Sequence, residues 1–502
     1  MFKLIFVYTR EETESHSTGA TMKTDQNLKI DLELLTEEII NNKIYPRPKN
    51  FDYSNVRPNG LYTLGLIQNN SRFVTIDEQV RRATEFAQFI LQKSNEDQWK
   101  NKTINICVVG SGLAGISCVL KLLEEDHNHK IKIKLLEKRH MLCPIQRNCL
   151  IRKVYPHLHK WPNIDLESLE PVQIIDGLEI ISGTAVGDFA AQCVQKLIQQ
   201  SGYDDRVQIL QDVSYLHISK LSEESNDLNI HASGKLLEQH GSMRPDSINE
   251  VFDVCILATG FGVETNHSDF KSANLISYWR NDDRSQVPLY SKNSTYIISG
   301  FGDGALSDLF RLKIYDYDAL RFLKEIEKFF NKKMTPELMS QSLKINEWEN
   351  ESFDVFEQLE LFFKEHMDPQ KLKNLASWIR DDNSTILHIR RSEATPLTVG
   401  FHQDSATQAI KRILNNQNSI IYNRFIFYVL WKLHGLRIEL TDSLDELVNL
   451  YKVPEENVLV RHGTDKLSVV RDILSPSLFS ITAQLMNKPA KKEETINLKV
   501  AG

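Results

Sequence analysis

The sequence predicts an α/β fold: a parallel βαβ unit, an inserted group of antiparallel strands, and a mostly α-helical C-terminal region. The apolar run INICVV at 104–109 ends at a glycine, as a buried strand would. A helix pattern follows over 113–125, and KIKIKLLEK at 130–138 alternates lysine with apolar residues before it closes on an acid. Strand, glycines, helix and strand in this order are typical of a βαβ crossover.

The bulk composition is that of an ordinary globular protein and argues against several classes. Of the 502 residues, 41% are apolar and 25% are charged, and the chain is long enough for two or three domains. A net charge of −7 gives no reason to expect a nucleic-acid partner. No apolar run is long enough to span a membrane, and the opening MFKLIFVY is too short for a signal peptide. We therefore expect a cytoplasmic protein.

The pattern along the chain predicts four segments. Residues 1–74 are polar and turn-rich and predict an irregular N-terminal extension. The others are a helix with a linker at 75–102, a nucleotide-binding domain at 103–316 with an insert at 140–202, and a mainly helical domain at 317–502. Antiparallel strands are expected at 205–218 and 228–234. Within the helical domain we expect strands only at 384–389 and 456–462.

Three glycines in VVGSGLAG have the spacing of a dinucleotide-binding turn. Gly110 would make the tight turn, Gly112 would let the backbone approach a pyrophosphate, and Gly115 would let the helix pack on the strand. The helix N-terminus offers unpaired N–H groups to the phosphates. Glu137 lies where an acid should accept ribose hydroxyls, and its charge disfavours a 2′-phosphorylated nucleotide there. The neighbouring residues predicted to line this site are Ser111, Leu113, Ala114 and Lys138.

A second string, GFGDGA at 300–305, raises the question of a second nucleotide. A second unit of the same kind should place another strand near 320–326, but LRFLKEIEKFF has helix periodicity. We therefore expect a single dinucleotide site, with this string as its closing element.

Together these motifs resemble the two-dinucleotide-domain flavoproteins, which include amine oxidases and aromatic hydroxylases. The resemblance rests on VVGSGLAG with Glu137, on the strand ending ATG at 258–260, and on the Gly-Asp pair at 302–303, and it spans about 103–312. It implies a Rossmann-like FAD-binding domain, with Thr259, Gly260 and Gly302 near the cofactor and Asp303 on the flavin ribityl chain. The strings PIQR, YPHLHKWP and GDGA also resemble a bacterial set of FAD/NAD(P)-binding proteins that carries no assigned substrate.

The segment after Glu137 departs from the superfamily pattern, because KRHMLCPIQRN lacks the usual glycine pair. Its Arg139, Gln146 and Arg147 could meet a pyrophosphate or the flavin edge, or could face solvent. The loop YPHLHKWP at 155–162 could line a substrate pocket or simply pack on its domain. Its two histidines have no third ligand at a suitable spacing, so we expect no metal, and no catalytic residue is identified.

The resulting hypothesis is an FAD-dependent oxidoreductase of oxidase or monooxygenase type that acts on a small organic substrate. NAD(P)H could serve as a transient electron donor. The missing C-x-x-C pair disfavours a disulfide reductase. The alternatives are a flavin- or dinucleotide-binding sensor or scaffold without turnover and, less favoured, an NAD-dependent dehydrogenase. Substrate, electron acceptor and oligomeric state are left open by the sequence.

Overall fold

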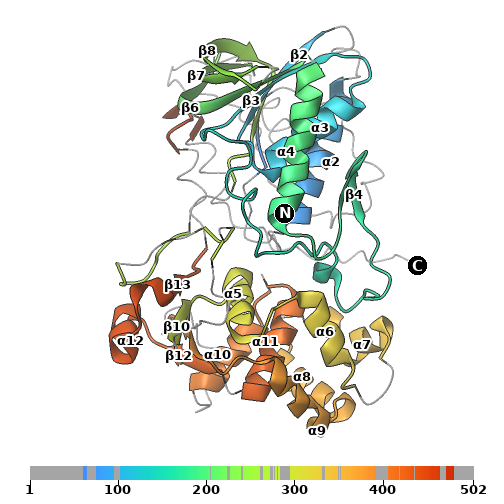
Figure 1. The fold of residues 1–502 in the computed structure, drawn as a ribbon, viewed down its shortest axis with the longest axis vertical. Coiled ribbons are helices and arrows are strands. Elements are labelled where there is room, and N and C mark those ends of the chain that lie inside the picture. Colours follow the sequence, from blue (N-terminus) through green and yellow to red (C-terminus); the bar gives the residue numbers. More distant parts are fainter. Residues whose placement is uncertain are drawn as a thin grey trace, which may run out of the picture.

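The computed structural model describes most of residues 60–479. The gaps of more than six residues are 65–74, 95–101, 283–293, 392–404 and 464–470, and shorter gaps occur elsewhere. The predictions for 1–59 and for the end of the chain beyond 479 lie outside the described residues. The described chain forms two stacked lobes, each with its own sheet (Figure 1).

A seven-stranded sheet forms the first lobe, in the order β1-β9-β2-β3-β6-β7-β8. The five strands from β1 to β6 run parallel, whereas β6, β7 and β8 form an antiparallel meander. The strands are β1 (Gly60–Thr63), β2 (Ile104–Val109), β3 (Ile131–Leu136), β6 (Val207–Lys220), β7 (Leu228–Leu237), β8 (Met243–Phe252) and β9 (Val254–Leu257). The predicted βαβ unit and antiparallel strands are therefore present, and β1 is a strand that the sequence analysis assigned to irregular chain.

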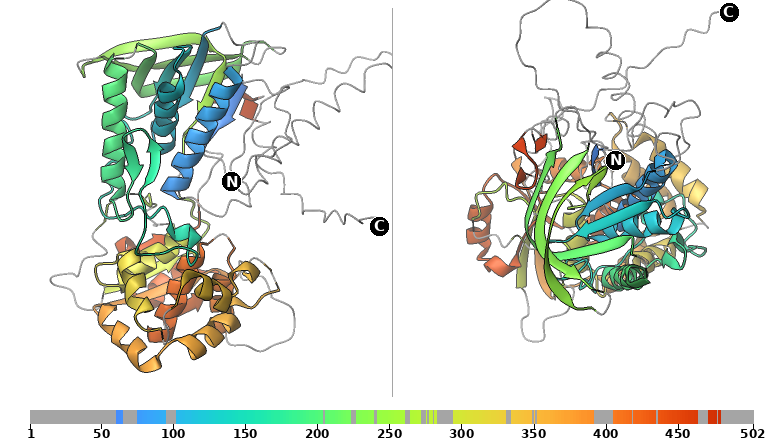
Figure 2. Two further views of the ribbon diagram at one scale, coloured as in Figure 1. Left: turned by 90° about the vertical axis from the view of Figure 1, so that its right-hand side faces the viewer. Right: turned by 90° about the horizontal axis from the view of Figure 1, so that it is seen from above.

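Helices cover one face of this sheet. They are α2 (Ile76–Ser94), α3 (Leu113–Glu125) and α4 (Val186–Tyr203), which run side by side beneath the sheet (Figure 2). Alternate residues of β2 explain the two faces: Ile106 and Val108 share a core with the helices, whereas Cys107 and Val109 share one with the meander. The insert also carries a small hairpin of β4 (Val172–Ile175) and β5 (Leu178–Ile180).

The second lobe is built on a four-stranded, fully parallel sheet in the order β12-β11-β10-β13. Its strands are β10 (Ser294–Ser299), β11 (Asn383–Ile389), β12 (Arg437–Leu440) and β13 (Val458–Val460). The strands expected at 384–389 and 456–462 are confirmed as β11 and β13. The short strand β12 was not predicted.

Helices make up most of the second lobe, as the sequence predicts. After β10 come α5 (Asp303–Lys313), α6 (Ala319–Glu327), α7 (Pro336–Ser342), α8 (Val355–His366) and α9 (Pro369–Leu372). After β11 come α10 (Ser405–Leu414) and α11 (Ile421–His434), and α12 (Leu444–Tyr451) precedes β13. The α12 helix packs on one face of the sheet through Leu444 and Leu447, while α5 and α11 lie in the core on the other face.

The chain connects the lobes more than once, because the second lobe is inserted into the first. After β9 the chain passes into the second lobe, and after β13 it returns to lie beside β6, where the Ile218 N–H donates to the Ile473 carbonyl at 2.8 Å. The 140–202 insert also reaches across, since Trp161 is buried in the second lobe's core with its ring centroid 4.7 Å from that of Phe425.

The prediction about the string at 300–305 is wrong in its topology. It follows β10, which pairs with β11 and β13 in the second sheet, and it opens α5. A second parallel βαβ unit is therefore present, which begins with β10 and has Gly300 in its first turn. Helix periodicity after the loop does not exclude such a unit here, because the partner strand does not follow the first helix directly: α6 to α9 are inserted between α5 and β11.

Candidate functional site

The first glycine loop has the geometry that a bound pyrophosphate requires. Gly110 has φ +103°, and a Cβ there would lie 2.4 Å from the Ala258 carbonyl oxygen, so only glycine fits. A Cβ on Gly115 would meet the Gly110 carbonyl at 2.0 Å, because α3 packs tightly on the loop. Gly112 differs, since nothing lies within 4 Å of its Cβ position and no side chain caps the helix that it begins. The N–H groups at the start of α3 thus face open space.

Glu137 closes the first loop from the next strand. It is buried and its Oε2 accepts hydrogen bonds from the Ser111 N–H at 2.9 Å and the Ser111 hydroxyl at 2.6 Å. Its Oε1 accepts one from the Arg139 N–H at 2.8 Å. A carboxylate has about four acceptor positions, so room for about one more donor remains, as a ribose hydroxyl would need.

The second glycine loop has the same conformation as the first. Gly300 has φ +124°, and a Cβ there would lie 2.2 Å from the Arg461 carbonyl oxygen. Gly302 begins α5 with φ −78° and ψ 178°, close to the −65° and 175° of Gly112, and again nothing lies within 4 Å of its Cβ position. Ala305, at the position of Gly115, is fully buried.

The strand beside each loop repeats as well. The Ala258 N–H donates to the Val109 carbonyl at 2.7 Å, and the Arg461 N–H donates to the Ser299 carbonyl at 2.8 Å. Two positions after each donor lies a glycine with positive φ. These are Gly260, two residues after Ala258, with φ +80°, and Gly463, two residues after Arg461, with φ +92°. The strand orders β9-β2-β3-β6 and β13-β10-β11-β12 are therefore the same arrangement, built twice.

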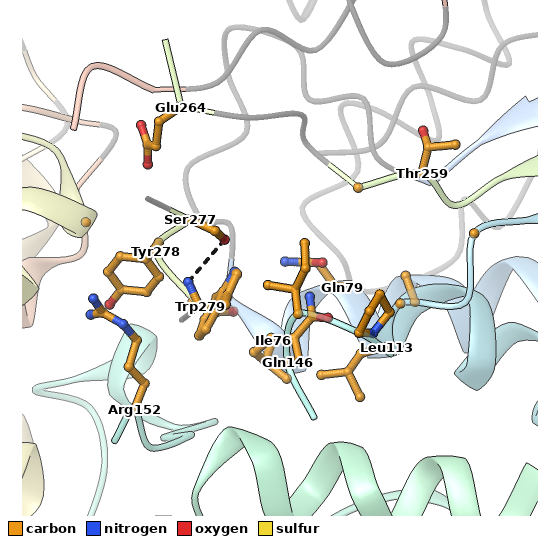
Figure 3. A pocket seen from close by; sticks show the side chains of 18 of the residues that line it. Ile76, Gln79, Leu113, Gln146, Arg152, Thr259, Glu264, Ser277, Tyr278 and Trp279 are labelled. Atoms are coloured by element: carbon orange, nitrogen blue, oxygen red, sulfur yellow. Dashed lines mark hydrogen bonds between the residues drawn. The ribbon is translucent and has the colours of Figure 1, made fainter. Parts of the chain in front are cut away.

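Both loops open on one large cavity. Its volume is about 2020 Å³, well above the usual size of a pocket for one drug-sized ligand. Figure 3 shows Leu113 and Thr259 at one end, and Arg152 with Tyr278 at the other. The residues that line it include Gly110, Gly112, Glu137, Gly260, Gly300, Gly302, Gly304, His462 and Gly463.

All the predicted cofactor-binding residues line this cavity except Ser111, Gly115 and Arg147. Ser111 holds Glu137 from behind the loop and Gly115 packs the helix, whereas Arg147 is exposed. In the segment after Glu137, the cavity is lined by Arg139, Gln146, Tyr155 and His159 but not by His157.

Asp303 lies in the second loop, apart from the first loop to which the prediction joined it. Asp303 is half-buried, and its carboxylate accepts hydrogen bonds from the Ser419 hydroxyl, from the Ile420 N–H at 3.1 Å and from the Asn423 amide at 2.7 Å. Burial raises the pKa of this carboxyl, against the effect of these donors. The carboxylate therefore ties α5 to the start of α11, and a contact with a ribityl chain stays a prediction.

A buried charge cluster lies beside the second loop. Asp308 accepts from Arg152 at 2.7 Å, Arg461 at 2.9 Å and Arg311 at 3.2 Å. Arg152 comes from the first lobe and stacks on the Tyr278 ring with its guanidinium carbon 3.6 Å from the ring centre. Burial alone would raise the pKa of Asp308, but the three guanidinium groups hold it far below its usual range. The cluster thus joins the lobes at the cavity wall.

Three polar side chains form a hydrogen-bond chain at the end of the second sheet. The Ser299 hydroxyl lies 2.7 Å from His388 Nδ1 and 2.6 Å from His462 Nε2. His388 Nε2 must donate to the Thr441 carbonyl at 2.9 Å, and His462 Nδ1 accepts from the His267 N–H at 3.1 Å. Burial, with the nearby charge of Arg390, lowers the pKa of His462 to about 4, so this imidazole is neutral at pH 7.

The residues that β13 and the following turn contribute to the site were not predicted from the sequence. The string VLVRHG repeats the strand-to-glycine pattern of CILATG, which is the signal that could have revealed them. Among the described residues, no helix is long and apolar enough to cross a membrane, and no group of histidine, cysteine or acidic side chains is placed to bind a metal.

No protein-family model and no curated protein matches the chain. Among solved structures, a polycyclic ketone monooxygenase from the fungus Thermothelomyces thermophila aligns over 76% of this chain and 65% of its own, at 11% identity and TM-score 0.33. L-lysine 6-monooxygenase from Pseudomonas syringae aligns over 43% of both chains, at 14% identity and TM-score 0.20. NDH2 from Plasmodium falciparum, in complex with NADH, aligns over 76% of this chain and 66% of its own, at 9% identity and TM-score 0.19.

The chain thus spans less than two thirds of the length of each of these structures. Likeness at this level does not define an activity or a family. What the chain itself defines is an α/β fold with two Rossmann-like units that face a shared cavity.

Proposed function

We propose that the protein is an FAD-dependent oxidoreductase that is reduced by a nicotinamide dinucleotide. The observation that carries this proposal is the repeated glycine loop: two loops of one conformation open on one cavity. Each loop offers uncapped N–H groups at a helix start and a glycine with open space beside it. Two dinucleotides bound at these loops would extend into the same space, where electrons could pass between them.

FAD fits the first loop. The space beside Gly112 and the N–H groups of α3 would hold its pyrophosphate, and the remaining acceptor position of Glu137 would take a ribose hydroxyl. Bound there, FAD would supply the two-electron chemistry, while the protein fixes its position and excludes water.

The nicotinamide dinucleotide would occupy the second loop. The space beside Gly302 would take its pyrophosphate, close to Arg461 and the N-terminus of α5. A second site of this kind would give the chain its own place for a reductant, which an oxidase does not need. Within the proposed class we therefore favour a monooxygenase or a reductase acting on a small organic substrate in the remaining cavity.

Absorption spectroscopy of the purified protein tests this proposal. We expect the two visible bands of oxidised flavin, and their loss when NADH or NADPH is added without oxygen. A protein without flavin, even after incubation with FAD, would contradict the proposal. Flavin that neither dinucleotide reduces would instead support the alternative, a flavin-binding sensor or scaffold without turnover.

A further inference from the structure

We infer that the second site selects a 2′-phosphorylated nicotinamide dinucleotide, and that Arg390 and Arg391 recognise the 2′-phosphate. This inference rests on the proposed function, because it names which nicotinamide dinucleotide the second loop takes. It follows from a comparison of the two Rossmann-like units, in which equivalent positions after the second strand carry different residues.

The strand register fixes that equivalence. In the first unit, Val109 is paired with Leu136 and the Gly110 N–H donates to the Leu136 carbonyl at 2.7 Å. In the second unit, Ser299 is paired with His388 and the Gly300 N–H donates to the His388 carbonyl at 3.0 Å. The residue after each carbonyl is therefore the same position. It is Glu137 in the first unit and Ile389 in the second.

This one exchange changes what the position can recognise. A carboxylate there accepts ribose hydroxyls and repels a 2′-phosphate. Ile389 is fully buried and apolar, so it neither accepts a hydroxyl nor repels an anion. Two basic residues follow in both units, Lys138 and Arg139 in the first, and Arg390 and Arg391 in the second. In the first unit these basic residues follow the carboxylate of Glu137, whereas in the second they follow the apolar Ile389.

The two arginines are held at the carboxyl edge of the second sheet. Arg390 donates from Nη1 to the His267 carbonyl at 3.1 Å, and Arg391 donates from Nη2 to the Leu440 carbonyl at 3.4 Å. A guanidinium has five N–H donors, so its one bond orients the Arg391 group and leaves other donors for a ligand, while Arg390 adds a second positive charge next to it in the chain. Arg391 is exposed and Arg390 is half-buried. Planar, always charged guanidinium groups suit bidentate contacts with a phosphate.

Calorimetric titration of the FAD-loaded protein tests the inference without relying on turnover. The probes are adenosine 2′,5′-bisphosphate and 5′-AMP, which differ in the 2′-phosphate, followed by NADPH and NADH after dithionite has reduced the flavin, so that no electrons can pass. We expect the bisphosphate to bind at least about tenfold more tightly than AMP, since one charged hydrogen bond is worth roughly that factor. NADPH should show the same preference over NADH.

Two variants assign the effect to the arginines. Arg391→Gln and Arg390→Gln should each weaken the bisphosphate by about tenfold or more and leave AMP unchanged. Arg391→Gln changes an exposed residue, so it keeps the test valid if the half-buried Arg390 variant does not fold. Lys364→Gln is the matched control, because it removes an exposed charge from α8 and should change neither affinity.

The outcomes separate the inference from the proposed function. Equal or tighter binding of AMP and NADH, or no effect of either arginine variant, would overturn the inference and leave a second nucleotide site in place. Failure of all four probes to bind would overturn both.

Discussion

Substitutions at Gly112 and Gly302 can block the two proposed sites one at a time. Both have negative φ, and a side chain at either would enter open space rather than strain the backbone. We expect Gly112→Val to fold and to lose FAD, because the valine would occupy the pyrophosphate position. The measurement is flavin content after purification and reconstitution. Gly302→Val is the matched control and should keep a full complement of FAD; flavin retained by Gly112→Val would place the cofactor elsewhere.

The role of Asp303 could not be predicted from the glycine motif alone. A carboxylate between glycines at a helix start could bind a polyol or cap a neighbour, and the choice depends on α11, more than a hundred residues further on. We expect Asp303→Ala to reduce the free energy of unfolding by about 1–3 kcal/mol, since it leaves buried donors without an acceptor. Asp303→Asn, which keeps one oxygen, should cost less. If denaturant titration shows no loss while FAD affinity falls, the carboxylate contacts the cofactor instead.

At the scale of elements, the first βαβ unit could be predicted because its signals are local and consistent. Strand, glycines, helix and second strand lie within 104–137, and the acid falls in register. The second unit shares the glycine loop but not the spacing, because its partner strand β11 begins only at Asn383. Strand β12 is too short to show a period of two, and β1 lies in a polar segment. The helices of the second lobe and its strands β11 and β13 were predicted correctly, whereas the pairing of its strands into one parallel sheet was not.

The α5 helix contributes both to the second glycine loop and to the buried charge cluster. Its first turn begins the second loop, and Asp308 on its next turn anchors the arginine cluster. We expect Asp308→Asn to destabilise the protein by about 3–5 kcal/mol, as loss of one partner of a buried ion pair does. Thermal or denaturant unfolding measures this. Asp316→Asn is the matched control, because that aspartate pairs with Arg321 at the surface, where an ion pair contributes little. An equal effect of the two changes would mean that the cluster is not anchored by Asp308.

The lowered pKa of Asp308 predicts that the stability of the whole protein depends on pH. The pKa of Asp308 is far below its usual range in the folded state, so its contribution is complete above the usual aspartate pKa and is lost as the pH falls below it. We expect the wild-type protein to lose stability between about pH 5 and pH 3, and the Asp308→Asn variant to lose less over this window. Parallel unfolding curves at several pH values measure the difference. Identical losses would assign the acid sensitivity to other groups.

At the scale of the molecule, the lobes are joined by buried contacts as well as by the chain. Trp161 carries the 140–202 insert into the second lobe's core, and Arg152 carries it to Asp308. Gln146, Tyr155 and His159 of this insert line the cavity, as a loop that covers a cofactor or substrate would require, and such a contact stays a prediction. Two loops held against one cavity would keep two dinucleotides at a fixed separation.

The most direct test of this arrangement is an anaerobic titration of FAD-loaded Gly302→Val with NADPH, followed by absorption. The account predicts that the flavin bands persist, although NADPH bleaches them in the wild-type protein and dithionite bleaches them in both. Bleaching of the variant at the wild-type rate would show that the reductant does not use the second loop, and would contradict the account.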